Sequence, residues 1–214
     1  MKKFIILLFA LSLACVSCSD KQSGTSSANA GDGINVDENE LPFGATMIDL
    51  DSERDGVPIS ISYEKRFMTE EEARKISDYI SAVNSCDVEL IKNTSYPSYL
   101  DYIVEYYGNT DIQDYLDSRQ KNVEDTYTGG KFDFNYILVN SLKDENDDDS
   151  ETGFSTLDRK ILENSPDAEI TSRKMVGIDV LYSLDGSGSY SLKARTGSDM
   201  NLYIYTIDGQ MYIL

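Results

Sequence analysis

The apolar residues of this chain change their spacing at about residue 130, and this change limits the folds that the chain can adopt. Before that point they recur at helical spacing, in segments that begin at capping residues. After it they alternate with polar residues, as in strands that bury one face. Helices followed by hairpin-linked strands favour an α+β domain, in which N-terminal helices pack on one face of a curved antiparallel sheet.

Four helices are predicted in the first part of the domain. Each has a start signal: a capping side chain that accepts a backbone N–H, or a proline in the first turn. The signals are the Thr69–Glu72 capping box, Asp87, Tyr96-Pro97 and Asp111. We expect Ile76, Ile80 and Val83 to face the sheet, because they lie on one side of the first helix.

The second part of the chain has the period of strands. The strand-like segments are Phe132–Leu138, Val176–Tyr182, Tyr190–Ala194, Leu202–Tyr205 and Met211–Ile213. Between the first two we expect an acidic loop, Lys143–Gly153, and a short helix, Leu157–Leu162. Asp208-Gly209 predicts a type I′ hairpin turn before the last strand.

A further pair of strand-like runs precedes the helices. ATMIDL and PISISY, within residues 45–63, are separated by the turn-rich DSERDG and predict a short β-hairpin. Pro58 favours an edge position for the second strand. The predicted domain therefore covers residues 45–214, with a helical part at 67–128 and a sheet part at 131–214.

The N-terminus has the pattern of a secretory signal peptide. Two lysines precede an apolar run from Phe4 to Ala14, and small residues follow. The run is shorter than the ~20 residues that a membrane-spanning helix needs. Cys15 and Cys18 at its end resemble the lipobox of bacterial lipoproteins, in which the cysteine after the cleavage site is acylated. We prefer Cys18 as the lipid anchor because a polar segment starts directly after it, and Cys15 is the alternative.

This interpretation predicts a lipid-anchored protein at the extracytoplasmic face of the cell membrane. Residues 1–17 would be the signal peptide and residues 18–44 a flexible tether, since 19–33 are rich in Ser, Gly and Ala. The membrane partner would be reached through an acyl chain such as palmitate on the cysteine, and not through a spanning helix.

Charge and composition exclude several function classes. The net charge is −19, which repels nucleic acid, so no nucleic-acid partner is expected. The chain has no histidine, which excludes Ser-His-Asp and Cys-His catalysis and histidine metal sites. Cys86 would be the single thiol beyond the anchor, so we expect no disulfide, no thiolate metal site and no cofactor.

Residues 51–56 match the start of a calcium-binding EF-hand loop. Oxygen-bearing residues occupy its first, third and fifth positions, and Gly56 its sixth. However, Ser62 stands at the twelfth position, where the loop needs a bidentate Glu. We therefore predict a hairpin turn here, and no metal site.

The order of elements over residues 68–214 resembles the nuclear-transport-factor-2-like fold, the cone-shaped, cystatin-like scaffold of SnoaL-like and ketosteroid-isomerase-like proteins. The likeness rests on Ala82–Asp87 between the first two helices and on the closing Tyr203–Ile213. That ending is similar to the final "dGkWyi" hairpin of many members, with Met211 in place of Trp. The resemblance implies a cone with a pocket.

Tyrosines are the candidate pocket residues. Tyrosines in an apolar cup bind flat or amphipathic ligands, and ordinary core packing is the alternative. The candidates for the ligand pocket are Tyr99, Tyr102, Tyr106, Tyr136 and Tyr182.

The favoured function is a non-catalytic binding or protein-interaction module, whose partner is a protein or a small amphipathic ligand. The alternative is a histidine-free enzyme of the SnoaL or isomerase kind, in which Asp101 or Asp179 acts as a base beside a pocket tyrosine. Both aspartates lie at positions predicted to be solvated. A third hypothesis is a homodimer formed through the sheet face.

The anchor prediction can be tested by replacing Cys18. We expect the wild-type protein to fractionate with membranes and Cys18→Ala to be released or left unprocessed, as shown by fractionation and acyl labelling. Cys15→Ala is the matched control and should leave anchoring intact. Acylation that survives Cys18→Ala and is lost in Cys15→Ala would move the anchor to Cys15.

Overall fold

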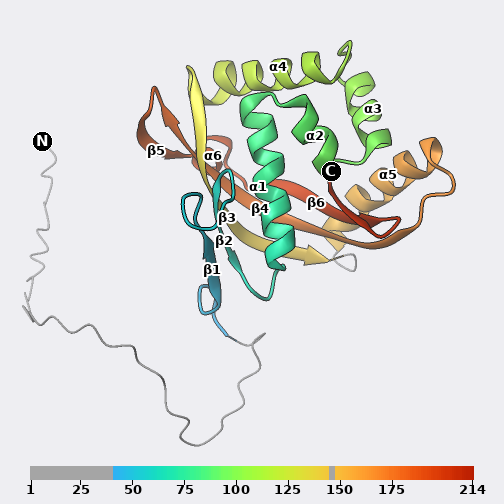
Figure 1. The fold of residues 1–214 in the computed structure, drawn as a ribbon, viewed down its shortest axis with the longest axis horizontal. Helices are drawn as coiled ribbons and strands as arrows, with labels where there is room; N and C mark the ends of the chain where they lie inside the picture. The colour runs from blue at the N-terminus through green and yellow to red at the C-terminus, as the bar shows by residue number, and fades with distance from the viewer. Residues whose placement is uncertain (1–40, 145–147) are drawn as a thin grey trace, which may run out of the picture. The chain divides into compact units, whose positions relative to one another are not determined.

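The structure, a computed structural model, describes residues 41–144 and 148–214 (Figure 1). The chain divides into two units, residues 1–35 and 36–214, and everything described belongs to the second. The predicted signal peptide, both candidate anchor cysteines and most of the predicted tether lie outside the described residues.

The described residues form an α+β structure with one mixed sheet. Its helices are α1 (Glu70–Ser85), α2 (Val88–Thr94), α3 (Pro97–Tyr106), α4 (Ile112–Val123), α5 (Asp148–Asn164) and α6 (Leu192–Thr196), and a π-turn (Glu124–Thr128) follows α4. Its strands are β1 (Met47–Leu50), β2 (Ser60–Glu64), β3 (Phe132–Asp144), β4 (Ile170–Leu184), β5 (Ser187–Ser191), β6 (Met200–Ile207) and β7 (Gln210–Ile213).

The predicted starts of the first four helices are confirmed. At α1, Glu72 N–H donates to Thr69 Oγ1 over 3.3 Å, and Thr69 N–H donates to Glu72 Oε2 over 2.7 Å. Asp87 accepts from Leu90 N–H at α2, and Asp111 accepts from Asp114 N–H at α4. These side chains satisfy backbone donors that the first helical turn leaves without partners.

The strand order is β1-β2-β3-β4-β6-β7, with β5 also paired to β4. β2 runs parallel to β3 and every other pair is antiparallel, so the prediction of a purely antiparallel sheet is wrong. The reason is the crossover through α1–α4 that joins β2 to β3, because parallel neighbours need such a connection. β2 also lies between two strands, and Pro58 precedes it without breaking the ladder, so its predicted edge position is wrong.

The residues of β3 that face the core change their alternation along the strand. Phe134 is opposite Tyr182, whereas Tyr136 is opposite Leu181, so the register shifts by a bulge between Phe134 and Tyr136. A bulge reverses which residues point inward. Phe134 is buried before it, and Ile137 and Val139 after it. The strict period of two predicted over Phe132–Leu138 therefore does not mark one inward face.

α5 is longer than predicted and begins inside the segment assigned to an acidic loop. Phe154, Leu157 and Ile161 recur at helical spacing and are buried. This apolar stripe packs against Met175 and Tyr205 of the sheet. Met175 and Val176 are consecutive, so they point to opposite faces of β4, and Val176 belongs to the cluster around α1. α1 and α5 therefore cover opposite faces, contrary to the prediction that all helices lie on one.

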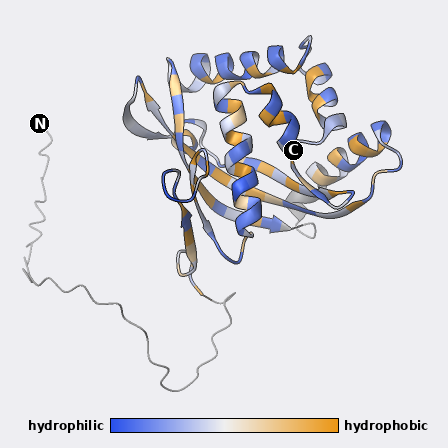
Figure 2. Cartoon of the chain, viewed as in Figure 1, coloured by the Kyte–Doolittle hydropathy of each residue, from blue (hydrophilic) through white to orange (hydrophobic). Residues whose placement is uncertain are grey.

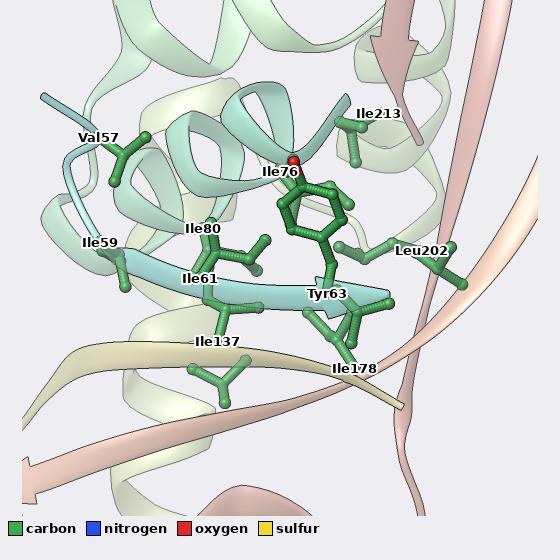
Figure 3. Close-up of a cluster of buried hydrophobic side chains, with 14 of the residues drawn as sticks. Val57, Ile59, Ile61, Tyr63, Ile76, Ile80, Ile137, Ile178, Leu202 and Ile213 are labelled. Atoms are coloured by element: carbon green, nitrogen blue, oxygen red, sulfur yellow. The ribbon is translucent and has the colours of Figure 1, made fainter. Parts of the chain in front are cut away.

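The main core joins α1 to the sheet. Figure 3 shows Ile76 and Ile80 of α1 among Ile61, Ile137 and Ile178 of three strands. All five are at most 1% exposed. In Figure 2, hydrophobic residues recur along the strands, whereas α1 carries both hydrophobic and hydrophilic residues. The prediction that Ile76 and Ile80 face the sheet is confirmed, whereas Val83 packs against a separate cluster of helix residues.

Ile80→Ala and Ile178→Ala test this core. Each should lower the free energy of unfolding by about 2–5 kcal/mol, because truncating a buried Ile removes apolar contacts and leaves a cavity. Since both belong to one cluster, the double variant should depart from additivity by about 0.5 kcal/mol or more. Leu162→Ala, at a 41% exposed site, is the control in denaturant melts. Losses as small as the control's would contradict the core assignment.

Glu64 holds the segment before β1. Its side chain is 0% exposed and accepts from Gly44 N–H and Thr46 Oγ1, with Arg66 Nε 3.7 Å away. The hydrogen bond from the Thr46 hydroxyl lowers the pKa of Glu64. The hydrogen bond from Gly44 N–H and the positive charge of Arg66 lower it further. The folded pKa lies below the unfolded value of about 4.3, so ionised Glu64 stabilises the fold above that pH.

We therefore expect wild-type stability to fall as the pH drops below ~4.3, and Glu64→Gln to remove part of that dependence. The measurement is the free energy of unfolding against pH. Glu89→Gln, whose carboxylate is 83% exposed beside Lys92, is the matched control and should keep the wild-type slope. Equal slopes for wild type and Glu64→Gln would contradict the assigned role.

Candidate functional site

A cleft of about 600 Å³ lies between the helices and one end of the sheet. Most of its lining residues come from α1, α3, α4, α5 and β6. Figure 1 labels these elements. Seven tyrosines and several aliphatic side chains line most of it, among them Tyr79, Ile80, Val83, Tyr99, Tyr102, Ile103, Tyr106, Tyr107, Tyr115, Leu116, Leu157, Leu202 and Tyr203. A volume of this size is typical of small-molecule sites, which span about 300–1,000 Å³.

The cleft begins where the sheet loses a strand. β7 pairs with β6 over Ile204–Ile207, and the backbone of Leu214 then bonds to Tyr203. Among the described residues no strand covers the next part of that β6 edge, Met200–Leu202. Met200, Asn201 and Leu202 line the cleft together with Leu214. These residues form the β6 side of the cleft.

A chain of tyrosine rings forms the wall on the α3 side. Successive ring centroids are 6.4 Å apart for Tyr99–Tyr102, 5.6 Å for Tyr102–Tyr106, 5.0 Å for Tyr106–Tyr107 and 5.7 Å for Tyr107–Tyr115. These are ordinary distances for aromatic pairs. Tyr106 and Tyr107 are 66% and 52% exposed, so the chain of rings runs from the interior to the rim.

Deeper tyrosines stay protonated. Burial raises the pKa of Tyr79 and of Tyr99 well above the ordinary value, and that of Tyr115 in the same direction. The positive charge of Arg119 opposes this change at all three. The three hydroxyls are therefore neutral hydrogen-bonding groups at physiological pH.

The lining carries one charged group. Arg119 of α4 is half-buried there, and none of the described lining residues is an Asp or Glu. An aromatic wall with one guanidinium can bind an apolar body by contact and orient a polar end by hydrogen bonds. It offers no carboxylate base beside a tyrosine.

Three of the five predicted pocket residues line the cleft: Tyr99, Tyr102 and Tyr106. Tyr136 does not, because the β3 bulge turns it towards β2, where its hydroxyl contacts Ser62 and Asp49. Tyr182 is 0% exposed, and its ring packs between Phe132 and Tyr190. It is a core residue.

The sequence prediction missed Tyr79, Tyr115, Tyr203 and Arg119 as lining residues. Tyr79 and Val83 are spaced by one helical turn, which was a usable signal for a second apolar face on α1. Tyr115 belongs to the same tyrosine-rich region as the residues that were named. Tyr203 follows Leu202 on β6, and no local pattern marked it as a lining residue.

Neither candidate catalytic aspartate lines the cleft. Asp101 is exposed on α3, as predicted. Asp179 is only 8% exposed, so its predicted solvation is wrong. Its carboxylate accepts from Ser191 Oγ over 2.7 Å and from Lys193 N–H over 2.9 Å. These bonds fix the start of α6, so of the strand predicted at 190–194 only Tyr190 and Ser191 lie in a strand, at the end of β5.

Residues 51–56 form a turn. Asp51 Oδ1 accepts from Glu53 N–H and Arg54 N–H, and Asp55 pairs with Arg54 over 2.8 Å. Over residues 41–144 and 148–214, no group of three or more acidic or cysteine side chains is placed to hold a metal ion. Cys86 ends α1 in a left-handed conformation, with φ 52°, and burial raises the pKa of its thiol.

No protein-family model, curated protein or solved structure matches this chain. Within the described residues, no helix combines the length and apolar character that crossing a membrane requires.

Titration of Tyr99 tests the buried character of the cleft. The pKa of Tyr99 in the folded protein exceeds the unfolded value of about 10. The neutral Tyr99 hydroxyl therefore stabilises the fold below that pH, and this stabilisation is lost as the pH rises above it. We expect the tyrosinate absorbance of Tyr99→Phe to differ from wild type only above pH ~10. A difference that develops at or below that pH would show that Tyr99 is solvated.

Proposed function

We propose that the mature protein is a lipid-anchored extracytoplasmic binding module, and that the cleft holds a small amphipathic ligand. The observation that carries this proposal is the cleft of about 600 Å³, lined by tyrosines and aliphatic side chains and open at a rim of exposed Tyr106 and Tyr107. Tyrosines suit such a ligand because each offers an apolar ring and a polar tip.

The order of elements supports the proposed likeness to the nuclear-transport-factor-2-like fold. Helices α1–α4 precede most of the sheet, and β6 and β7 close the chain through Asp208-Gly209, both at positive φ. The proposed cone would be the space between α1, α3 and the end of β6. β1 and β2 pair antiparallel and would extend that scaffold at the far side of β3.

A binding role is favoured over the enzyme alternative by the chemistry of the walls. Acid–base catalysis of the isomerase kind needs a carboxylate within hydrogen-bond reach of the reacting atom. Asp179 is held by Ser191 and Lys193, and Asp101 is exposed on α3 outside the lining. The arrangement around the cleft is therefore suited to holding a ligand rather than to moving a proton.

The test uses the soluble chain of residues 19–214, which contains every described residue, and the neutral fluorescent probe N-phenyl-1-naphthylamine. We expect saturable binding with one site per chain. Val83→Trp should weaken it about tenfold or more, because an indole at this cleft-lining position occupies the volume that a probe would fill. The probe is excited directly, outside the tryptophan absorption band.

Val88→Trp is the matched control. Val88 is also half-buried on a helix, but it does not line the cleft. Melting temperatures of both variants check that the fold persists. Failure of the probe to bind wild type, or equal losses in the two variants, would contradict a ligand site in this cleft.

A further inference from the structure

Arg119 has no acidic partner on its own helix. The residues three and four positions away, which share its side of α4, are Tyr115, Leu116, Asn122 and Val123. In the part of the chain that the structure describes, no carboxylate forms an ion pair with Arg119. Its guanidinium carbon lies 5.3 Å from the centroid of the Tyr107 ring.

Other cations near the cleft are neutralised. Lys193 pairs with Asp199 over 3.0 Å, and Lys160 pairs with Glu163 over 3.0 Å. Acidic residues outnumber basic ones by 38 to 19 in the whole chain, so carboxylate partners are plentiful. A half-buried guanidinium without one is costly, because a desolvated charge needs a counter-charge or hydrogen bonds.

Arg119 lies over the Tyr107 ring, and it lines the cleft. Arg119 also lines a smaller adjoining cavity of about 370 Å³. The two cavities share Val123, Leu192 and Met200 as well. A guanidinium over an aromatic ring can keep its edge N–H groups available, and two of these can bind a carboxylate side by side.

We propose that the ligand is a small organic anion, with its apolar body among the cleft tyrosines and its acidic group, a carboxylate or sulfonate, on Arg119. This inference rests on the proposed function and specifies the chemistry of its ligand. Charge complementarity carries it: an unpaired cation within an apolar wall of a strongly acidic protein selects an anion with an apolar body. The cleft's volume suits a free small molecule.

The test compares two probes with the same aromatic skeleton. 8-Anilinonaphthalene-1-sulfonate carries an anionic group, and N-phenyl-1-naphthylamine lacks it. Wild type should bind the anionic probe more tightly than the neutral one, despite a net charge of −19. Arg119→Gln should weaken the anionic probe about tenfold or more, as expected for a charge-assisted hydrogen bond, and leave the neutral probe within about twofold.

Arg195→Gln makes the same change of net charge at an exposed position outside the lining and should leave both affinities unchanged. If Arg119→Gln does not fold, the relative affinity of wild type for the two probes alone tests the inference. Equal or weaker binding of the anionic probe by wild type would overturn the inference, as would equal losses in Arg119→Gln and Arg195→Gln. In either case, continued binding of the neutral probe would leave the proposed function standing.

Discussion

The packing of α1 against the sheet is the interaction on which both the core and the cleft depend. Ile76 and Ile80 are buried in the core, and Ile80 also lines the cleft with Tyr79 and Val83. Three contacts fix the helix: the Thr69 capping box, a 2.7 Å ion pair between Glu72 and Lys174 of β4, and Ser77, whose hydroxyl donates to Ile59 O and accepts from Ile59 N–H. Because one face of α1 is packed against the sheet, the position of its other face is fixed as well. That other face forms part of the wall of the cleft.

Local signals in the sequence were sufficient for the first four helices, but not for the length of α5, for α6 or for the sheet. Thr69, Asp87, Pro97 and Asp111 act on neighbouring backbone, so their meaning does not depend on the rest of the fold. The β3 bulge, the parallel pairing of β2 with β3, and the burial of Asp179 depend on which segments meet in space. A period-two pattern cannot indicate them, because one bulge reverses the inward face. The anchor cysteines remain a prediction.

The candidate site was predictable to the extent that it is local. Tyr99, Tyr102 and Tyr106 lie on one short helix, and their common spacing identified them together. Tyr136 and Tyr182 were expected beside them, but they belong to strands whose register was unknown. Arg119 carried a weaker signal: a cation on a helix without an acidic neighbour one turn away. Its role depends on the ring of Tyr107 and on the open edge of β6, which only the fold brings together.

The central claim is that ligand binds between α1, α3 and β6. The most direct measurement is a methyl-region NMR titration of residues 19–214 with 8-anilinonaphthalene-1-sulfonate, because methyl groups report on each wall separately. The account predicts that Val83, Leu157 and Leu202 of the cleft shift together with one dissociation constant, while Val88, outside the lining, and Val139, buried in the core, stay in place. Saturable shifts at Val88 or Val139, with none at the three cleft residues, would contradict it.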